Sequence, residues 1–329
     1  MLSSDDQQAL LAWYDAHQRD LPWRSTRDPW AILLSEVLLQ QTQVSRGLVY
    51  WQRMLAEFPT LADMANAPVE AVLKAWEGAG YYSRARRLHS LAQQVMLASS
   101  EGGFDGTLPT TFEALLGLPG IGPYTAAAVA SIAFGQAVAC VDGNIRRVMA
   151  RTTANPSPSA AEVQAWADAS LEHERPGDWN QALMELGATV CTPKRVRCGD
   201  CPLQPRCQGR DTPEAYPLPA SQKVKTLELT AVVAYDANGL PVLTQRPMTG
   251  MFAGLWGPTY LEGHVEVEGC TEVGTVHHAL SHRKITVRVL LQSEPNETTG
   301  PEGTQPSSVA MSNMDSKVLE VATQPKAER

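Results

Sequence analysis

Four of the six cysteines in this 329-residue chain stand in one short segment. They follow the pattern C-x6-C-x2-C-x5-C and are Cys191, Cys198, Cys201 and Cys207. A disulfide framework is not expected in a long chain that shows no secretion signal, so the spacing predicts a metal site. Zinc modules usually present two close cysteine pairs, whereas one close pair flanked by wider single ligands also suits an iron-sulfur cluster. The spacing alone leaves both metals open.

Two carboxylates lie where acid-base chemistry is possible. Glu36, in AILLSEVLLQQ, shares a helical face with Ile32 and with Leu39 or Gln40, so desolvation would raise its pKa and keep it protonated as a general acid. Alternatively, Glu36 ends a helix face at the surface. Asp142, in VDGNIRR, precedes a helix and reads as an N-cap. The helix N-terminus would hold that carboxylate ionised, which suits an enzyme that faces a developing cation.

A glycine-rich turn separates two predicted helices in LPGIGPYTA, residues 118–126. Gly120 and Gly122 allow close approach of a backbone, and the following helix begins near a proline. Free N–H groups at that helix N-terminus can hold a DNA phosphate without reading bases. A plain connection between two helices would need no function, so this alternative stays open.

The elements that must position these residues change character along the chain. From residue 4 to about 210, apolar residues recur at three- and four-residue spacing, which predicts a helical unit. Residues 211–223 contain three prolines and predict an extended linker. Beyond it, residues 227–246 predict two strands joined by an Asn238-Gly239 turn, and residues 284–292 predict a third. Residues 293–313 predict a mobile loop or tail.

Composition bounds the class of protein. With 43% hydrophobic and 19% charged residues, the chain is expected to fold into two or three packed units. A net charge of -8 argues against a histone-like protein that holds nucleic acid by bulk electrostatics. The first residues lack the features of a secretory signal, and no uncharged run predicts a membrane span. We therefore expect a cytoplasmic protein, associated with the nucleoid if its source is bacterial, and no membrane partner.

Six segments together carry a resemblance. They are LSEVLLQQTQV, GYYSRARRLH, LPGIGPYTAAAVAS, VDGNIRRV, NQALMELGA and the four-cysteine loop. In this order they resemble the helix-hairpin-helix DNA glycosylases related to endonuclease III, and more narrowly the adenine DNA glycosylases of the MutY type. The resemblance is dense from residue 8 to about 210. The C-terminal part resembles the Nudix-like domain of that family only weakly.

The resemblance implies a mainly α catalytic region over residues 1–210 and a smaller α+β Nudix-like domain over residues 224–329. Within the first region, it implies a six-helix barrel with the hairpin at about 20–133. Residues 1–19 and 134–210 would form the iron-sulfur subdomain. It further implies one 4Fe-4S cluster on the four cysteines, and a monomer that acts on double-stranded DNA containing adenine mispairs.

The implied reaction is hydrolysis of the N-glycosidic bond of adenine mispaired with 8-oxoguanine or guanine. Glu36 matches the general acid that protonates adenine at N7. Asp142 matches the carboxylate that stabilises the sugar oxocarbenium ion, or briefly bonds to it, before water enters. Tyr124 stands where bifunctional relatives carry a lysine nucleophile. A tyrosine cannot form a Schiff base, so the enzyme is expected to be monofunctional.

The resemblance also implies DNA contacts. Gln41 matches a residue inserted into the duplex, and Tyr81 one wedged beside the oxidised guanine. An aromatic-Ser-His turn of the family corresponds here to Leu280, Ser281 and His282, so the stacking aromatic is missing. The other residues implied to contact DNA are Trp23, Arg24, Leu39, Thr42, Val44, Gly120, Gly122 and Glu185.

The sequence also suggests two other functions, each opposed by particular features. A bifunctional glycosylase and lyase of the endonuclease III type is opposed by Tyr124 and by the extra domain. A noncatalytic iron-sulfur protein that binds DNA is opposed by the presence of both Glu36 and Asp142.

Overall fold

The structure is a computed structural model that describes residues 1–219, 224–280, 283–292 and 302–323. Its chain divides into two compact units. The first comprises Met1–Asn66 and Ser90–Ala220, and the second comprises Ala67–His89 and Ser221–Arg329. No helix in the described part of the chain has both the length and the apolar character needed to cross a membrane.

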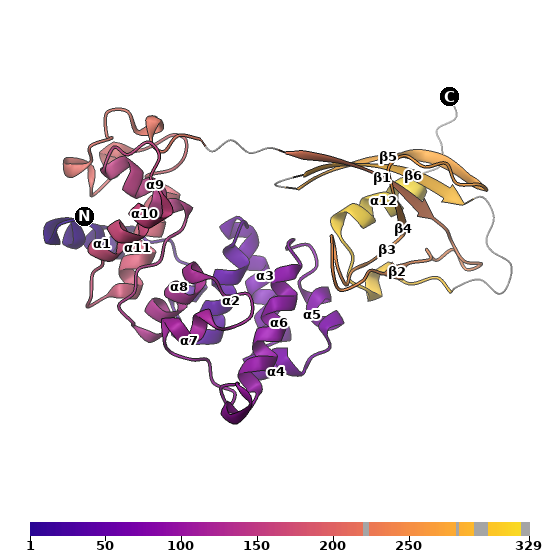
Figure 1. Cartoon of the computed structure of the whole chain (residues 1–329), viewed down its shortest axis with the longest axis horizontal. Helices are drawn as coiled ribbons and strands as arrows, with labels where there is room; N and C mark the ends of the chain where they lie inside the picture. Colours follow the sequence, from indigo (N-terminus) through magenta and orange to yellow (C-terminus); the bar gives the residue numbers. More distant parts are fainter. Residues whose placement is uncertain (220–223, 281–282, 293–301, 324–329) are drawn as a thin grey trace. The chain divides into compact units, whose positions relative to one another are not determined.

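The first unit is helical, as the apolar spacing predicts (Figure 1). Its α-helices, one of which continues from the second unit, are α1 Ser4–His17, α2 Pro29–Leu39, α3 Val44–Glu57, α4 Leu61–Asn66, α6 Ser83–Met96, α7 Phe112–Leu116, α8 Pro123–Phe134, α9 Gly143–Thr152, α10 Ala160–Ala169 and α11 Pro176–Thr189. Short 3-10 turns lie at η1 Pro22–Arg24, η2 Ser99–Glu101, η3 Cys198–Asp200, η4 Gln204–Arg206 and η5 Pro213–Ala215.

Helix α2 lies inside this unit. Asp28 caps it by accepting hydrogen bonds from the backbone N–H groups of Trp30 and Ala31, and Pro29 occupies its first position. Every residue from Trp30 to Leu38 is buried, since α2 packs against both α3 and α8. The helix is apolar all round apart from Ser35 and Glu36, so it carries the Glu36 carboxyl into the interior.

Helices α8 and α11 and the N-terminal cap of α9 contribute residues around the Glu36 carboxyl. Helix α11 packs against α1, α8 and α9, and α8 also packs against α7. The approach of α11 to α9 depends on Gly187, because an added Cβ there would lie 2.5 Å from the Cβ of Asn144. The N-termini of α8 and α9 are thereby held close to one face of α11.

The second unit combines a helical segment with a sheet. Residues 67–89 contribute α5, Val69–Ala75, and the first turns of α6. The strands are β1 Lys225–Val233, β2 Thr244–Gln245, β3 Trp256–Gly257, β4 Thr259–Glu262, β5 Cys270–Leu280 and β6 Arg283–Gln292. The four-stranded sheet has the order β4-β1-β6-β5, with β1 parallel to β6 and the other pairs antiparallel.

The strand pairing differs from the hairpin predicted around Asn238-Gly239. The turn forms, but β1 and the segment after it meet only at an isolated bridge between Tyr235 and Pro241, and β1 pairs with β4 and β6 instead. Pro241 has no N–H to donate to a ladder. The Asp236 carboxylate accepts the backbone N–H groups of Asn238 and Leu240, which curls the chain away from β1.

A C-terminal helix that the sequence patterns did not predict completes this unit. Helix α12, Asn313–Thr323, packs against β1, β5 and β6, and its Met314, Val318 and Ala322 join the sheet core (Figure 1). Of the predicted loop, residues 293–301 lie outside the described residues. Residues 302–312 carry the 3-10 turn η6, Pro306–Ser308, and lead into α12. An α+β architecture follows for this unit.

Candidate active site

A cavity of about 520 Å³ opens in the first unit between η1, α2, α8, α9 and α11. Three of its lining residues are the predicted catalytic groups Glu36, Tyr124 and Asp142. Seven others are among the residues implied to contact DNA, namely Trp23, Arg24, Leu39, Gln41, Thr42, Val44 and Glu185. The structure therefore brings together residues that are up to about 160 positions apart in the sequence.

Glu36 is the buried acid of this cavity. Its side chain lies in the middle of α2 and the residue is only 7% exposed. Burial raises the pKa of Glu36 to about 7, against a smaller lowering by the hydrogen bond from Tyr124 and a further rise from the nearby Asp142. The rise predicted from the sequence is confirmed. Near neutral pH the carboxyl is therefore divided between a form that can donate a proton and one that cannot.

Tyr124 holds the Glu36 carboxyl in place. Its hydroxyl donates to Oε2 of Glu36 over 2.6 Å and lies 3.1 Å from Sδ of Met184. Burial, reinforced by the charge of Glu36, raises the pKa of Tyr124 well above its usual value, so the phenol stays neutral and remains a donor. Tyr124 is the second residue of α8, directly after Pro123, and this position aims it at α2.

Asp142 caps α9 at the opposite side of the cavity. Its Oδ1 accepts the backbone N–H of Ile145 over 2.7 Å, and its Oδ2 accepts Nδ2–H of Asn144 over 2.7 Å. Despite these hydrogen bonds, burial raises the pKa of Asp142 above its usual value. The predicted N-cap is confirmed, and the hydrogen bond from the helix N-terminus lowers the pKa of Asp142 as expected. Desolvation outweighs the helix N-terminus at this depth.

Glu185, whose side chain is fully buried, pairs with two arginines. Arg19 donates to both its oxygens over 2.7 Å, and Nη2 of Arg24 donates to Oε2 over 2.7 Å. Burial alone would raise the pKa of Glu185, but the hydrogen bonds from the two guanidinium groups lower it to about 2. The guanidinium of Arg24 also lies 5.4 Å from the ring centroid of Tyr14. Glu185 is thus an ionised anchor that fixes Arg24 at the cavity wall.

Eight residues that line the cavity were not among the predicted site residues: Arg19, Leu21, Gln40, Gly143, Asn144, Gln181, Met184 and Ala188. Asn144 could have been inferred, since a polar residue two positions after an N-cap aspartate can hydrogen-bond it. Arg19 lies in the connection between α1 and η1, where the sequence shows no helical or strand periodicity. Gln181 and Met184 lie on α11, whose rotation about its own axis is set by packing rather than by its sequence.

Other predicted DNA contacts lie outside this cavity. Gly122 caps α8 without a side chain, and nothing lies within 4 Å of where its Cβ would be, while Gly120 has a positive φ of 79°. The N-terminal N–H groups of α8 are thus approachable by a phosphate. Tyr81 belongs to the second unit, is 40% exposed and has a φ of 50°. Ser281 and His282 lie outside the described residues.

The four clustered cysteines line one small pocket of the first unit. Nη1–H of Arg151, itself 2% exposed, donates to Sγ of Cys191 over 3.3 Å. Within the described part of the chain, no three His, Cys, Asp or Glu side chains are arranged to hold a single metal ion.

A hydrogen-bonded path joins this cysteine loop to Asp142. Nε–H of Arg147 donates to the carbonyl oxygen of Cys191, and its Nη2 donates to Oδ1 of Asn144 and to the carbonyl oxygen of Gly187. Asn144 in turn donates to Asp142. The position of the half-buried Asp142 carboxylate therefore depends on the packing of α9 against both α11 and the cysteine loop.

Comparison with known proteins gives this geometry a context. Residues 34–171 match the family described as "HhH-GPD superfamily base excision DNA repair protein". The chain is 35% identical over 379 residues to the adenine DNA glycosylase of Homo sapiens, covering 90% of this chain and 68% of the human protein. It is 44% identical over 200 residues to the adenine DNA glycosylase of Mycobacterium tuberculosis (strain ATCC 25618 / H37Rv), covering 59% of this chain and 64% of that protein.

Solved structures agree on the fold of the helical unit. A thermostable thymine-DNA glycosylase matches with a TM-score of 0.57 and 29% identity, over 62% of this chain and 94% of that one. A non-covalent endonuclease III-DNA complex matches with a TM-score of 0.54 at 24% identity, which shows a shared fold alone. Both likenesses are to chains of about the length of the helical unit.

Proposed function

Because the chain belongs to the adenine DNA glycosylases of the HhH-GPD base excision repair superfamily, it removes adenine from DNA, and we propose that its targets are adenines mispaired with 8-oxoguanine or guanine. We propose further that it does so without cleaving the strand. The observation that carries the mechanism is the buried Glu36 carboxyl, which receives a hydrogen bond from Tyr124 in the cavity that also holds Asp142.

In this mechanism Glu36 is the general acid. An extrahelical adenine enters the cavity, and the protonated carboxyl donates its proton to a ring nitrogen of the base. The N-glycosidic bond then breaks, and its electron pair leaves with the now neutral adenine. The pKa of about 7 supports this role, because a carboxyl with an ordinary pKa would hold almost no proton at neutral pH.

Asp142 faces the sugar in this mechanism. Loss of adenine leaves positive charge on the sugar ring, which the Asp142 carboxylate stabilises until a water oxygen bonds to the anomeric carbon. The water's released proton returns to the Glu36 carboxylate. Asn144 and the N–H of Ile145 keep the Asp142 carboxylate oriented, so its charge needs no reorganisation when the cation forms.

The cavity supports a hydrolase without a lyase step. A lyase of this superfamily would need an amine that attacks the sugar and forms a Schiff base. The described residues that line the cavity include no lysine, and Tyr124 is engaged with Glu36. Water is therefore the nucleophile in our proposal.

We propose a 4Fe-4S cluster for the cysteine pocket. Cys191, Cys198, Cys201 and Cys207 would each hold one corner, because all four line the same small pocket and four thiolates are the usual ligand set of such a cluster. Such a cluster, when bound, crosslinks the loop. Arg151 offsets part of the negative charge of the thiolates through its hydrogen bond to Cys191.

DNA contacts follow from the same assignment. We propose that the N-terminus of α8 behind Gly120 and Gly122 holds a backbone phosphate, and that Gln41 enters the duplex from the cavity rim. Gln41 has a φ of 59°, a conformation that costs energy and is kept where function over-determines it. Tyr81, with a φ of 50°, is assigned to the strand opposite the adenine.

One experiment tests these points together. Duplexes with adenine opposite 8-oxoguanine, opposite guanine and opposite thymine, and a duplex with thymine glycol, are incubated with excess protein and analysed with and without alkali. We expect cleavage of the first two duplexes, and only after alkali. Cleavage without alkali would indicate the bifunctional alternative, and binding without base removal from any duplex would indicate the noncatalytic one.

A further inference from the structure

The connection between α8 and α9 carries Asp142 at its end. Its residues 135–142, all of which the structure describes, form neither helix nor strand. The connection nevertheless passes through the interior of the first unit, since Ala139 is 4% exposed and Cys140 is 1% exposed. Buried backbone N–H and C=O groups need hydrogen-bond partners, and an irregular segment has no ladder of its own to supply them. The groups that pair with this connection therefore help to set the place of Asp142.

One side chain supplies two of these partners. Asn180 lies in the second turn of α11 and is 1% exposed. Its Oδ1 accepts the backbone N–H of Cys140 over 3.2 Å, and its Nδ2–H donates to the carbonyl oxygen of Val138 over 2.9 Å. A residue of a neighbouring parallel strand would bond the same two groups, one on each side of Ala139. The Asn180 amide thus takes the place of a paired strand.

The amide is itself held in one orientation. Its Nδ2 also donates to Oγ of Ser131 on α8 over 2.8 Å, and that hydroxyl donates to the carbonyl oxygen of Ala127. Helix α11 comes very close to α8 here, because a Cβ added to Gly177 would lie 2.6 Å from the carbonyl oxygen of Ser131. Both N–H groups of the amide and its oxygen are engaged, and a flipped amide would set its oxygen against the Val138 carbonyl oxygen.

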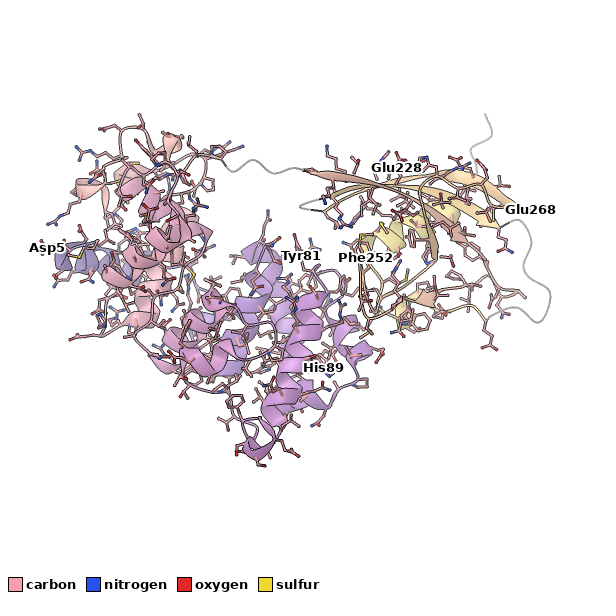
Figure 2. The ribbon with its side chains drawn as sticks, viewed as in Figure 1. Asp5, Tyr81, His89, Glu228, Phe252 and Glu268 are labelled. Carbon is pink, nitrogen blue, oxygen red and sulfur yellow. The ribbon has the colours of Figure 1, made fainter. Side chains whose placement is uncertain are left out.

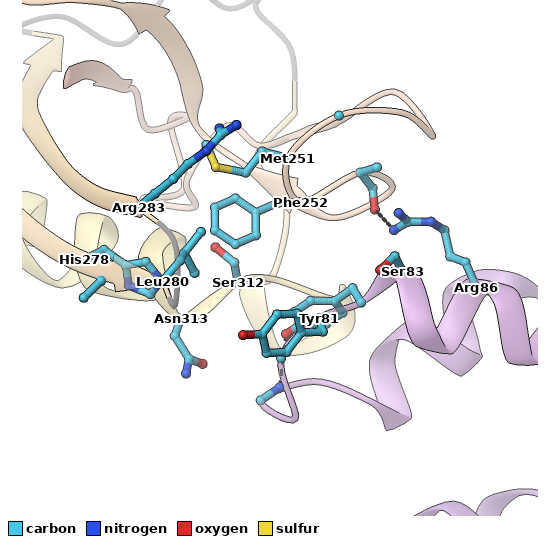
Figure 3. Close-up of a pocket in the computed structure, with 16 residues that line it drawn as sticks. Tyr81, Ser83, Arg86, Met251, Phe252, His278, Leu280, Arg283, Ser312 and Asn313 are labelled. Atoms are coloured by element: carbon cyan, nitrogen blue, oxygen red, sulfur yellow. Dashed lines mark hydrogen bonds between the residues drawn. The ribbon is translucent and has the colours of Figure 1, made fainter. Parts of the chain in front are cut away.

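In two other irregular segments, a side chain donates to one backbone carbonyl group. In the second unit, Nε2–H of His89 donates to the carbonyl oxygen of Ala67 over 2.9 Å (Figure 2), and Nη1–H of Arg86 donates to that of Ala253 (Figure 3). A single bond of this kind holds a segment at one point only. The Asn180 amide pairs instead with an acceptor and a donor two residues apart, so it fixes both the position and the rotation of the connection.

Asp142 is thereby held from both directions along the chain. After it, the backbone N–H of Ile145 and the side chain of Asn144 hold the carboxylate by hydrogen bonds. Before it, the bond from Cys140 to Asn180 holds the backbone that leads to the cavity. The cap sets the rotation of the carboxylate relative to α9, whereas Asn180 sets how far the chain advances. A displacement of about 1 Å at a reacting group can cost about 100-fold in rate.

Resting on the proposed function, we infer that Asn180 is a positioning residue for adenine removal and that it acts through the place of Asp142. The described residues that line the active-site cavity do not include Asn180, so its side chain does not contact an adenine there. Its two bonds to the connection lie two and four residues before Asp142. Loss of the Asn180 amide should therefore slow the chemical step and leave the affinity for a mispaired duplex unchanged.

The test is a double-mutant cycle in the full-length protein. Asn180→Ala removes the amide from the Val138 carbonyl and the Cys140 N–H. We expect the single-turnover rate for adenine opposite 8-oxoguanine to fall about 10- to 100-fold, and the affinity, measured in a Glu36→Gln background, to change less than about threefold. In an Asp142→Asn background, Asn180→Ala should lower the rate less than about threefold, because the group through which Asn180 acts is already lost.

Ser131→Ala is the matched control. It removes a buried hydroxyl that bonds the same amide but leaves both bonds from Asn180 to the connection in place. We expect it to lower the melting temperature and to keep the rate within about threefold of that of the unaltered protein. A rate loss as large as that of Asn180→Ala would overturn the inference, because general loosening of α11 against α8 would then account for both.

Two further outcomes decide the matter. Equal rate losses from Asn180→Ala with and without Asp142→Asn would overturn the inference, since Asn180 would then act independently of Asp142, and so would a loss of affinity as large as the loss of rate. If Asn180→Ala does not fold, Asn180→Ser takes its place in the same cycle, because its hydroxyl ends where Cγ of the asparagine lies and cannot bond both groups. Failure of the unaltered protein to remove adenine from any mispair would instead refute the proposed function.

Discussion

At the scale of single residues, the cavity is defined by two carboxyl groups, Glu36 and Asp142, and by the ion pairs of Glu185. Glu36 was predictable because a lone carboxyl in a helix that is apolar on all sides must be desolvated. The rise in the pKa of Asp142 was not predictable, because the cap is a local feature whereas the desolvation depends on helices packed around α9, such as α11. The ion pairs of Glu185 with Arg19 and Arg24 join residues more than 160 positions apart, and no local pattern announces them.

The raised pKa of Glu36 predicts a pH-dependent cost in stability. Its folded pKa of about 7 exceeds the ordinary 4.5, so the folded protein binds the proton more tightly than the unfolded chain does. The contribution of protonated Glu36 to the free energy of unfolding is fully present below pH 4.5. It is lost as the pH rises towards 7, which lowers the free energy of unfolding by up to about 3 kcal/mol. Glu36→Gln removes this loss, so we expect it to raise the free energy of unfolding at pH 8 and to change it little at pH 5. Urea unfolding at both pH values measures this difference, and an equal effect at both would contradict the burial argument.

The activity of the same variant follows from its lost proton. Glu36→Gln should lower the single-turnover rate of adenine removal by at least about 100-fold, while the affinity for a mispaired duplex changes less than about threefold, because the amide keeps the shape. In the unaltered protein, the rate should decline as the pH rises above about 7 and the carboxyl loses its proton. Matched losses of affinity and rate would show that Glu36 only supports the fold.

Asp142→Asn tests the second carboxylate. An asparagine can still cap α9 but cannot offer a full negative charge to the sugar cation, so we expect a rate loss of about 100-fold or more with a folded protein. Asn144→Ala, which leaves the charge but frees one carboxylate oxygen, should give a smaller loss. Retention of most activity by Asp142→Asn would leave the residue as a cap alone.

At the scale of elements, the helices were predictable and their contacts were not. The close packing of α9 on α11 requires a glycine at residue 187. Nothing in the segment NQALMELGA indicates that its glycine lies at a helix contact. The predicted hairpin failed for a similar reason: the choice of β6 over the nearer segment as a partner for β1 depends on residues far along the chain.

Gly187→Ala should therefore reduce adenine removal without touching the cavity. The added Cβ would meet Asn144 at 2.5 Å and push the N-terminus of α9, and Asp142 with it, away from its place. We expect a rate loss of about tenfold or more. Gly117→Ala is the matched control, since its Cβ would meet its nearest neighbour at 3.4 Å. Equal rates for the two variants in single-turnover assays would show that the close contact between α11 and α9 does not position Asp142.

The cysteine loop predicts a measurable metal content. Anaerobically purified protein should contain about four irons and four sulfides per chain and absorb in the visible range. Cys198→Ala should lower the iron content and, through the path from Cys191 to Arg147 and Asn144, the rate of adenine removal. Zinc without iron in metal analysis would favour the alternative that the spacing left open.

At the scale of the whole molecule, the second unit is discontinuous in sequence. Residues 67–89 belong to it although they read as part of the helical region, and about 130 residues separate them from the next segment of that unit. Helical periodicity describes each helix by itself and says nothing about its tertiary partner, so a division drawn from composition follows the chain. The contacts that join the segments involve side chains and backbone carbonyls, which leave no pattern in the sequence.

This arrangement predicts that the C-terminal sheet depends on α5. Nζ of Lys74 donates to the carbonyl oxygen of Val309 and forms an ion pair with Glu77. Glu77 in turn accepts the N–H of Met311. Replacing Lys74 and Glu77 together by methionine removes these contacts and leaves neither charge without its partner. At about 1 kcal/mol for each lost hydrogen bond, we expect the second unit to melt a few degrees lower and to be cut faster by protease in the segment before α12. The double replacement of Arg175 and Asp178, an ion pair with the same i, i+3 spacing in the first unit, is the control and should leave that segment protected. If both double variants expose the segment to protease equally, the sheet is held by its own core, and residues 67–89 are only its neighbour.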